Sequence, residues 1–505
     1  MELQFQLPSI WLTLLLFIIS PLAIFILNFG IRRKTRSLRL PPGPIHLPIL
    51  GHLHLIDRAL PHRSISLLSK KHGPIMHLQL GLKPTLVVSS ARAAAEIFKA
   101  HDHVFSRRPA LVSNRALTYN FSDVAFSPHN GDEWKEMRKL LVRELLNAKT
   151  VKSFRSLREA EVEKMFSAIR ASSPSSQPID LKEILITLTN NVACIAAFGR
   201  SYLDGSEQEK KKLMEVIDEG MYVLSRFFIE DFVPWMWWVD VAGGLYAKLE
   251  KSFGDLDEFY ERVIQDHLDA MTQETEPQDF LGIFLRDMKH YNLAREHIKG
   301  VMMNILFGAT DTSAAVVSWG MAELLRSPRA LKKCQEEVRR IVGKKGRVDE
   351  DDLPQLEYLK AVVKESFRLH PPGPLSIPRE CTQKCKVGGY DVLPGTMLIV
   401  ANWAIGRDPE AWDDPNEFLP ERFLNTSIDF KGQDFGLVPF GSGRRGCPGI
   451  QFAAATIEIV LANLLYSFDW EPPGGVSAEN MDMTEASGLV TLPKSMILVP
   501  TRHDI

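Results

Sequence analysis

The sequence predicts a mainly α protein with small β-sheets. Apolar residues recur with helical periodicity over several long segments of the 505-residue chain, whereas stretches typical of strands are few and short. Hydrophobic residues make up 45% and charged residues 24%, which is ordinary for a globular protein and excludes disorder. The net charge of −2 gives no indication of nucleic-acid binding. Five cysteines are too few for a disulfide framework, and Cys381 and Cys385 lack the second pair of a zinc site.

The first predicted element is a transmembrane helix. Residues 10–27 contain no charged residue, and eighteen helical residues span about 27 Å, close to the core of a bilayer. A basic run follows directly, and positive charge stays on the cytosolic side of a membrane. The basic residues lie after the apolar segment, which argues against a cleaved signal peptide. We therefore expect residues 1–30 to be a single-pass membrane anchor, with a cytosolic body. The basic residues are Arg32, Arg33, Lys34, Arg36 and Arg39.

Residues 31–45 are predicted to be a basic, proline-rich hinge, and residues 46–505 to form one body. Prolines 41, 42 and 44 exclude a helix because each fixes φ and lacks an N–H group. The body shows no internal repeat and no long glycine-serine linker. Helices are predicted at 132–146, 153–171, 255–273, 296–326, 328–342, 355–370 and 450–468. Strands are predicted at 76–80, 85–89, 386–390 and 397–401, with proline-rich loops at 371–378 and 408–423.

The segment 441–446 has the glycine spacing of a dinucleotide-binding loop. That function needs a strand before the glycines and a βαβ unit after them. Here the preceding run contains Pro439, and only about sixty residues follow. A membrane-anchored nicotinamide dehydrogenase that rests on this match is therefore a weak alternative.

Cys447 follows these glycines and precedes the helix predicted at 450–468. Backbone N–H groups and the positive end of the helix dipole favour a thiolate at such a position. Arg444 and Arg445 add positive charge nearby, and the glycines let a flat ligand approach the backbone.

This loop resembles the cysteine loop of the cytochromes P450, F-x-x-G-x-R-x-C-x-G. The resemblance extends over essentially the whole chain, in its plant A-type microsomal form. It implies the cytochrome P450 fold, preceded by the transmembrane helix, and makes Cys447 the axial ligand of a haem b iron. The matching residues are Phe440, Gly443, Arg445, Cys447 and Gly449.

Glu365 and Arg368 lie one helical turn apart. Alone, such a pair is typical of a surface ion pair that contributes a few tenths of a kcal/mol. It resembles the family's E-x-x-R motif, and the segment 418–423 resembles the motif that supplies a second arginine, here Arg422. The resemblance implies a buried structural network, whose loss would prevent haem incorporation.

The segment 308–313, Gly-Ala-Thr-Asp-Thr-Ser, interrupts the helix predicted at 296–326. By itself it reads as a helix defect, because glycine and back-bonded threonine weaken or bend helices. It resembles the family's oxygen-activation motif, although Ala309 replaces a glycine. The resemblance makes Thr312 and Asp311 the catalytic candidates: Thr312 would position a water beside dioxygen, and Asp311 would supply protons.

Four further residues resemble the family's partners for the haem propionates. Trp134 and Arg138 match W-x-x-x-R on one helix face, and Arg379, within Pro378-Arg379-Glu380, and Arg445 resemble further propionate partners of the family. An arginine beside a carboxylate makes a strong charge-assisted hydrogen bond.

The substrate pocket is expected, by position in the family, along residues 111–119, 303–307, 375–377 and 487–490. These segments are mostly apolar, so the substrate should be a lipophilic small molecule, with a terpenoid and a phenolic such as a flavonoid equally plausible. The expected pocket residues are Tyr119, Phe307, Gly308, Leu375, Ser376, Ile377 and Leu489.

Two surfaces are expected to bind partners. A basic surface would receive an NADPH–cytochrome P450 reductase, which supplies electrons from NADPH. Trp235, Trp237 and Trp238 would enter the membrane, because tryptophan favours bilayer interfaces; a buried cluster is the alternative. The basic candidates are Lys135, Arg138, Lys139, Arg143, Lys332, Lys333 and Arg444.

The expected function is that of a haem-thiolate monooxygenase, which hydroxylates a lipophilic plant specialised metabolite with O2. A P450 that couples phenols, desaturates or rearranges its substrate stays open. A haem-binding carrier or sensor is disfavoured, because it would not need the acid–alcohol pair Asp311 and Thr312.

Overall fold

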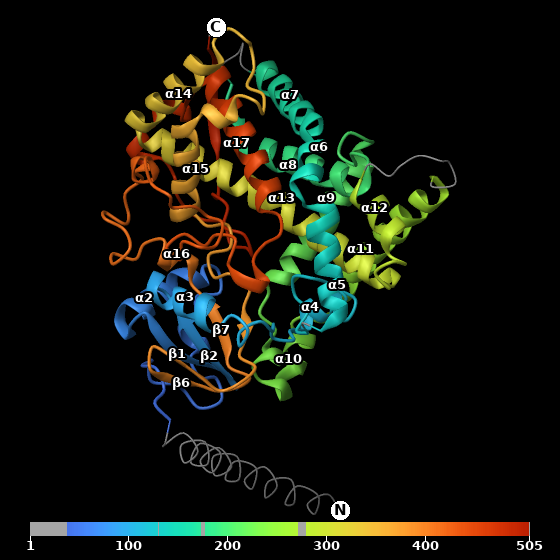
Figure 1. Ribbon diagram of the computed structural model, residues 1–505, viewed down its shortest axis with the longest axis vertical. Helices are drawn as coiled ribbons and strands as arrows, with labels where there is room; N and C mark the ends of the chain where they lie inside the picture. Colours follow the sequence, from blue (N-terminus) through green and yellow to red (C-terminus); the bar gives the residue numbers. More distant parts are fainter. Residues whose placement is uncertain (1–37, 130, 173–176, 271–278, 504–505) are drawn as a thin grey trace, which may run out of the picture.

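The computed structural model describes residues 38–129, 131–172, 177–270 and 279–503. The expected transmembrane helix and the start of the expected hinge lie outside these residues. Figure 1 shows the long helices α13, α15 and α17 in one part of the molecule and the strands β1, β2, β6 and β7 together at its lower end. The helices are α2 Pro61–His72, α3 Ala91–Ala95, α4 Val112–Leu117, α5 Asp132–Leu140, α6 Ala148–Ser153, α7 Arg155–Ser172, α8 Leu181–Phe198, α9 Glu207–Ser225, α10 Trp237–Ala242, α11 Leu245–Ala270, α12 Phe280–Asp287, α13 Arg295–Arg326, α14 Pro328–Val342, α15 Glu357–Leu369, α16 Asn402–Ile405 and α17 Ile450–Ser467.

The strands form three small sheets, with orders β1-β2-β7-β4, β3-β9-β8 and β5-β6. In the first sheet β1 and β2 are antiparallel, β2 and β7 are parallel, and Thr85 is paired with Met397. β4 lies antiparallel beside β7, which places Arg379 opposite Leu398. The strands are β1 Ile75–Leu80, β2 Lys83–Val88, β3 Ile179–Asp180, β4 Arg379–Glu380, β5 Cys385–Val387, β6 Tyr390–Val392, β7 Met397–Val400, β8 Phe468–Glu471 and β9 Ile497–Arg502.

The expected mainly α architecture with small sheets is confirmed. The helices predicted at 296–326, 328–342 and 450–468 differ from α13, α14 and α17 by at most one residue at each end. The helix predicted at 132–146 changes to a wider π-helical turn, Leu141–Leu145, after α5. α11 begins ten residues earlier than predicted, at Leu245.

α13 is the central helix of the helical part. It packs against α8, α15 and α17, and most of its side chains from Ser313 to Leu325 are buried. Together with α8 and α17, it is one of three helices among the described residues that are long and apolar enough to cross a membrane. Each of them is largely buried by its neighbours, so their apolar character is explained by packing in the core.

The described end of the expected hinge is bonded to two sheets, through β6 of the two-stranded sheet and β1 of the four-stranded sheet. The backbone of Arg39 exchanges hydrogen bonds with Asp391, and Pro42 O accepts from His77 N at 2.8 Å. His52 links Pro44 O at 2.9 Å to Gln79 N at 2.7 Å. The extended proline run thus lies beside β1, in keeping with proline's preference for the edge of a sheet, where its missing N–H is not needed.

Candidate active site

A cavity of about 490 Å³ lies between α13, α9, the first sheet and the loop that carries Cys447. Residues from many separate parts of the chain line it, and most of them are apolar. Three buried arginines and one half-buried arginine line one part of this cavity, and its remaining polar residues are scattered singly. The lining therefore combines an apolar surface with one concentrated cationic edge.

Cys447 lies in a tight turn directly before α17. Its backbone N–H donates to Phe440 O at 2.9 Å, and its Sγ accepts from Gly449 N at 3.3 Å. Phe440 packs against Phe367 and, like Cys447, lines the cavity. The turn thus presents the thiol to the cavity from a rigid backbone.

The charges around Cys447 differ from the expected ones. Burial raises the pKa of its thiol, opposed by the Gly449 N–H and by the positive charge of Arg138. Arg444, which was expected to help, is exposed and lies beside Asp102, and Arg445 donates to backbone carbonyls elsewhere. The thiolate of Cys447 therefore needs a further positive charge at the sulfur, such as a metal ion, because the protein alone favours the thiol.

Gly443 is required by the shape of this loop. Its φ of +68° favours glycine, and a Cβ there would lie 2.1 Å from Asp102 Oδ1. Asp102 occupies that space because it accepts from Arg444 N at 3.1 Å and from Arg379 Nη1 at 3.0 Å. Asp102 was not predicted, although it joins the cysteine loop to β4.

The cationic edge of the cavity consists of Arg108, Arg138, Arg379 and Arg445. Burial lowers the pKa of each guanidinium, in Arg445 to about 10 and in Arg108 well below the usual range. Their mutual repulsion adds to this effect, whereas the nearby carboxyl of Asp123 favours the charge on Arg445.

These arginines are positioned by backbone carbonyls. Arg138 donates to Gly446 O at 2.6 Å, and Arg379 to Ser442 O at 2.6 Å. Arg445 donates to the carbonyls of Ser106 and Val124. Arg108, which was missed, donates to Ile377 O at 2.5 Å.

The donor set fits a haem. Four guanidiniums, of which only that of Arg138 is half-exposed, are accompanied by the two carboxyls of Asp102 and Asp123, and burial raises the pKa of Asp123 to about 6, so positive charge is in excess. Two propionates would neutralise it. Cys447 then supplies the thiolate in the same cavity.

Trp134 supports this edge and does not itself line the cavity. Its indole N–H donates to Val124 O at 3.0 Å, and Arg445 Cζ lies 4.2 Å above its ring. Trp134 and Arg445 thus share the Val124 carbonyl as an acceptor, and the propionate contact expected of Trp134 stays a prediction.

Within α13, Gly308 and Thr312 line the cavity, and Thr312 Oγ1 donates to Gly308 O at 2.7 Å. Asp311 does not line it. Burial, and secondarily the charge of Asp218, raise the pKa of the Asp311 carboxyl to about 6. Asp311 is therefore a carboxyl that exchanges protons near neutral pH, one residue from a hydroxyl in the cavity.

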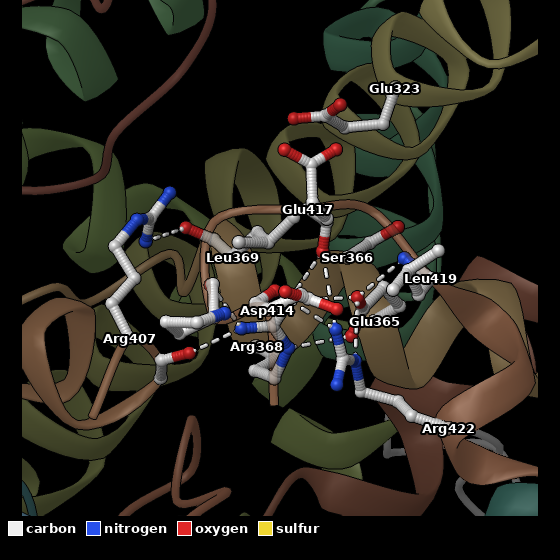
Figure 2. A network of polar contacts seen from close by, with 12 residues as sticks. Glu323, Glu365, Ser366, Arg368, Leu369, Arg407, Asp414, Glu417, Leu419 and Arg422 are labelled. Carbon is white, nitrogen blue, oxygen red and sulfur yellow. Dashed lines mark hydrogen bonds and ion pairs between the residues drawn. The ribbon is translucent and has the colours of Figure 1, made fainter. Parts of the chain in front are cut away.

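Glu365, Arg368 and Arg422 form one buried network (Figure 2). Arg368 Nε lies 2.6 Å from Glu365 Oε2, and Arg422 Nε lies 3.0 Å from Glu365 Oε1. Leu419 N also donates to Glu365, at 2.7 Å. The carboxylate thus receives donors from α15 and from the loop 413–422.

The arginines of this network also bind the loop backbone. Arg368 donates to the carbonyls of Gly406, Pro415 and Glu417, and Arg422 donates to Asp413 O at 2.8 Å. A buried ion pair is tolerated when every charge and donor is satisfied. This arrangement gives α15 the means to hold a loop that has little regular structure.

Six of the seven expected pocket residues line the cavity, and Tyr119 does not. Tyr119 has a φ of +51°, which turns its ring away to pack at 5.2 Å against Phe253 of α11. The expectation for Tyr119 is therefore wrong, and Val124, Ala125 and Phe126 line the cavity from that part of the chain instead. The six residues are Phe307, Gly308, Leu375, Ser376, Ile377 and Leu489.

Sequence reasoning also missed polar residues of the cavity. Asn304 lines it, and its Oδ1 accepts from the backbone N–H groups of Val124 and Ala125 at 3.1 and 3.0 Å. His62 reaches it from α2, and Ser225 from α9. The asparagine within the apolar segment 303–307 was a usable signal, whereas nothing local marks His62 or Ser225.

Comparisons with known proteins agree with this geometry. The family model described as Cytochrome P450 matches residues 41–500. The chain is 44% identical to Strychnine-11-hydroxylase of Strychnos nux-vomica, over 95% of both chains. It is 40% identical to Parthenolide synthase of Tanacetum parthenium, over 100% of both chains. A zebra fish cytochrome P450 solved with abiraterone superimposes with a TM-score of 0.74 at 26% identity, covering 88% of this chain and 99% of that one. The chain therefore belongs to the cytochrome P450 family of haem monooxygenases, in its plant A-type branch.

Proposed function

We propose that this P450 hydroxylates a neutral, lipophilic plant specialised metabolite, with O2 and with electrons from an NADPH–cytochrome P450 reductase. The main observation behind this proposal is that Cys447, Gly308 and Thr312 all line one mostly apolar cavity. The same cavity has its cationic edge where the haem propionates would bind.

The haem, when bound, supplies the activation of O2. Cys447 would hold the iron, and Arg108, Arg138, Arg379 and Arg445 would hold the propionates. The Thr312 hydroxyl, which lines the cavity, would hold a water, and Asp311, one residue earlier and outside the lining, would supply protons. The apolar lining excludes bulk water and orients the substrate.

The charge distribution supports a neutral substrate. Among the described residues that line the cavity none is acidic, so an ammonium group would meet no carboxylate. The arginines belong to the haem edge. A terpenoid and a phenolic such as a flavonoid both meet these conditions.

Product mass tests the reaction type. We expect microsomes that contain this chain and a reductase to convert a member of a terpenoid or a phenolic pool, supplied separately, into a product heavier by one oxygen atom, only when NADPH is present. A Cys447→Ala variant is the control and should give no product. A product lighter by two hydrogen atoms would favour the alternative of coupling or desaturation, and a haem spectrum without any product in both pools would favour a carrier or sensor.

We also propose that the body is held at the endoplasmic reticulum membrane by residues 1–30 and by the tryptophan segment. Trp235, Trp237 and Trp238 are 54%, 52% and 57% exposed, on η6 (Pro234–Met236) and the start of α10. Half-exposed tryptophans next to the exposed Val241 are suited to a bilayer interface. The segment is tied to the β1–β2 turn by Leu82 N, which donates to Phe232 O at 2.7 Å.

Lipid-dependent quenching tests the membrane contact. We expect vesicles with brominated acyl chains to quench the tryptophan fluorescence of the protein, and replacement of Trp235, Trp237 and Trp238 by alanine to remove most of that quenching. Trp319→Phe is the control, because Trp319 is fully buried and its loss should leave the quenching unchanged. Equal quenching in the triple variant would contradict the proposal.

The basic residues expected to bind the reductase need one change. Arg138 points inward to Gly446, so it does not belong to the surface. Lys135, Lys139 and Lys333 each form an ion pair with a neighbouring acid, which reduces their charge toward a partner. Arg143 and Arg444 are the exposed arginines of the set, and Arg444 is 63% exposed.

Salt dependence tests this surface. We expect the reductase KM to rise with ionic strength and to rise about tenfold in an Arg143→Glu, Arg444→Glu double variant, because like charges slow the encounter. Lys211→Glu, on the exposed side of α9, is the matched control and should leave the KM unchanged. A reductase KM that does not respond to salt would count against the surface.

A further inference from the structure

One end of the cavity is built by two segments that lie far apart in the chain. α2 contributes His62, and the hairpin of residues 484–494 contributes Gly488, Leu489, Val490 and Thr491. The hairpin is closed by Ala486 N, which donates to Leu492 O, and by Lys494 N, which donates to Thr484 O. Its four cavity residues therefore move as a unit with its two arms.

The C-terminal arm of this hairpin is fixed to the body. Thr491 N donates to Pro372 O, its Oγ1 donates to Pro371 O, and its own carbonyl accepts from Trp319 Nε1 at 2.9 Å. These bonds join the arm to α13 and to the loop after α15. The position of the hairpin tip then depends on the N-terminal arm.

That arm is held by an ion pair at Glu485. Its side chain is 2% exposed, and its Oε2 lies 3.0 Å from His62 Nε2 and 2.9 Å from Arg63 Nε. Burial would raise the pKa of Glu485, but the hydrogen bonds from His62 and Arg63 outweigh burial and lower it to about 2. Glu485 is thus ionised throughout the physiological range.

The α2 side of the ion pair is itself rigid. The Arg63 guanidinium lies 4.4 Å over the ring of Trp403, and the Arg407 guanidinium lies 3.9 Å from the same ring. His62 is 2% exposed and also lies beside Trp403. Because His62 and Arg63 are held against Trp403, their bonds to Glu485 fix the hairpin at a set position relative to α2.

We propose that Glu485 is a positioning residue for the substrate: by joining α2 to the hairpin through His62 and Arg63, it sets where Leu489 and Val490 meet the substrate and so which carbon reaches the haem. The proposal rests on the proposed function only in that substrate binds in this cavity. It assigns Glu485 no contact with the substrate.

Azole titration of the ferric protein separates this role from general destabilisation. Imidazole is small enough to bind the haem iron without reaching the hairpin, whereas clotrimazole is a bulky azole that fills the cavity above the iron. We expect Glu485→Gln to raise the Kd of clotrimazole at least about fivefold and to leave the Kd of imidazole unchanged. Glu479→Gln, an exposed acid six residues earlier, is the control and should change neither.

A second variant protects the test if Glu485→Gln fails to incorporate haem. Arg63 is 42% exposed, so Arg63→Met should fold, and it removes one of the two donors to Glu485. We expect it to shift clotrimazole binding in the same direction, and Arg63→Lys to restore part of the wild-type value. With a substrate identified in the product assay, both variants should change the KM and the ratio of products oxidised at different carbons. Their kcat should stay within about twofold of the wild-type value.

The outcomes are distinct. If the wild type shows no spectral shift with imidazole, the proposed haem site fails, and the ion pair is not at issue. If the wild type responds to both azoles and both variants keep its clotrimazole Kd and product ratio, the positioning role of Glu485 is wrong. If imidazole and clotrimazole weaken equally, Glu485 supports the fold alone, which also overturns the proposal.

Discussion

Glu365→Ala is expected to give a protein that does not incorporate haem. The substitution removes the carboxylate that balances the charge of Arg368, whose side chain is 0% exposed. It leaves the Arg368 Nε group without its acceptor, and Nη2 keeps only its bond to Glu417 O. It also leaves the Leu419 N–H and Arg422 Nε without their acceptor. Removing one partner of a buried ion pair costs about 3–5 kcal/mol, a large fraction of a typical stability of about 5–15 kcal/mol.

The loss should be structural rather than catalytic. Without Glu365 the loop 413–422 loses the bonds from Leu419 N and Arg422 Nε to α15, and its remaining bonds to α15 come from Arg368, whose charge is then unbalanced. Absorbance of the haem and the carbon monoxide difference spectrum measure the outcome. Glu357→Ala, in the first turn of α15, is the control and should keep both spectra. A Glu365→Ala protein with full haem content and lowered kcat alone would contradict this role.

Local patterns in the sequence predicted the parts of the site whose geometry is local. The turn from Phe440 to Gly449 is closed by bonds within ten residues, and Glu365 and Arg368 are neighbours on one helix. The bounds of α13, α14 and α17 were predicted because Arg326, Pro328 and the glycines before Ile450 mark their ends.

Other elements were missed because their signal is not amphipathic or not local. α8 is apolar and mostly buried, so it presents no polar stripe that would mark a helix. β3 pairs with β9 across more than 300 residues, and β8 pairs with β9 at the end of the chain. No local sequence pattern identifies the partner of such a strand. α9, whose Met221, Leu224 and Ser225 line the cavity, was missed with its substrate contacts.

Side-chain direction was the hardest property to predict. Tyr119 lies close in sequence to the residues that do line the cavity, but its left-handed backbone points its ring at α11. Arg108 was missed because an arginine in a sequence is indistinguishable from a surface arginine until its buried carbonyl partners are known. The roles of Asp102, His62 and Glu485 likewise depend on partners in distant segments of the chain.

Asp311→Asn is expected to lower kcat about 100-fold, because general acid groups contribute about that factor or more, and asparagine releases no proton. The wild-type activity should fall as pH rises above 6, since the pKa of Asp311 is about 6 and its protonated fraction decreases there. In Asp311→Asn this dependence should disappear. Glu296→Gln, in the first turn of the same helix, is the control and should keep both the rate and the pH profile.

Stability distinguishes this catalytic role from a structural one. Burial and the charge of Asp218 raise the folded-state pKa of Asp311 from 3.8 to about 6, so its ionised form is disfavoured by folding. The folded protein therefore loses stability as the pH rises from about 4 through 6, because Asp311 must then ionise in a site that disfavours its charge. Asparagine does not ionise, so the variant does not lose this stability. Asp311→Asn should therefore unfold at the same temperature as the wild type or higher at pH 7, while its turnover is low. A variant that loses activity and stability together would show that Asp311 supports α13, and it would contradict the proton-supplying role.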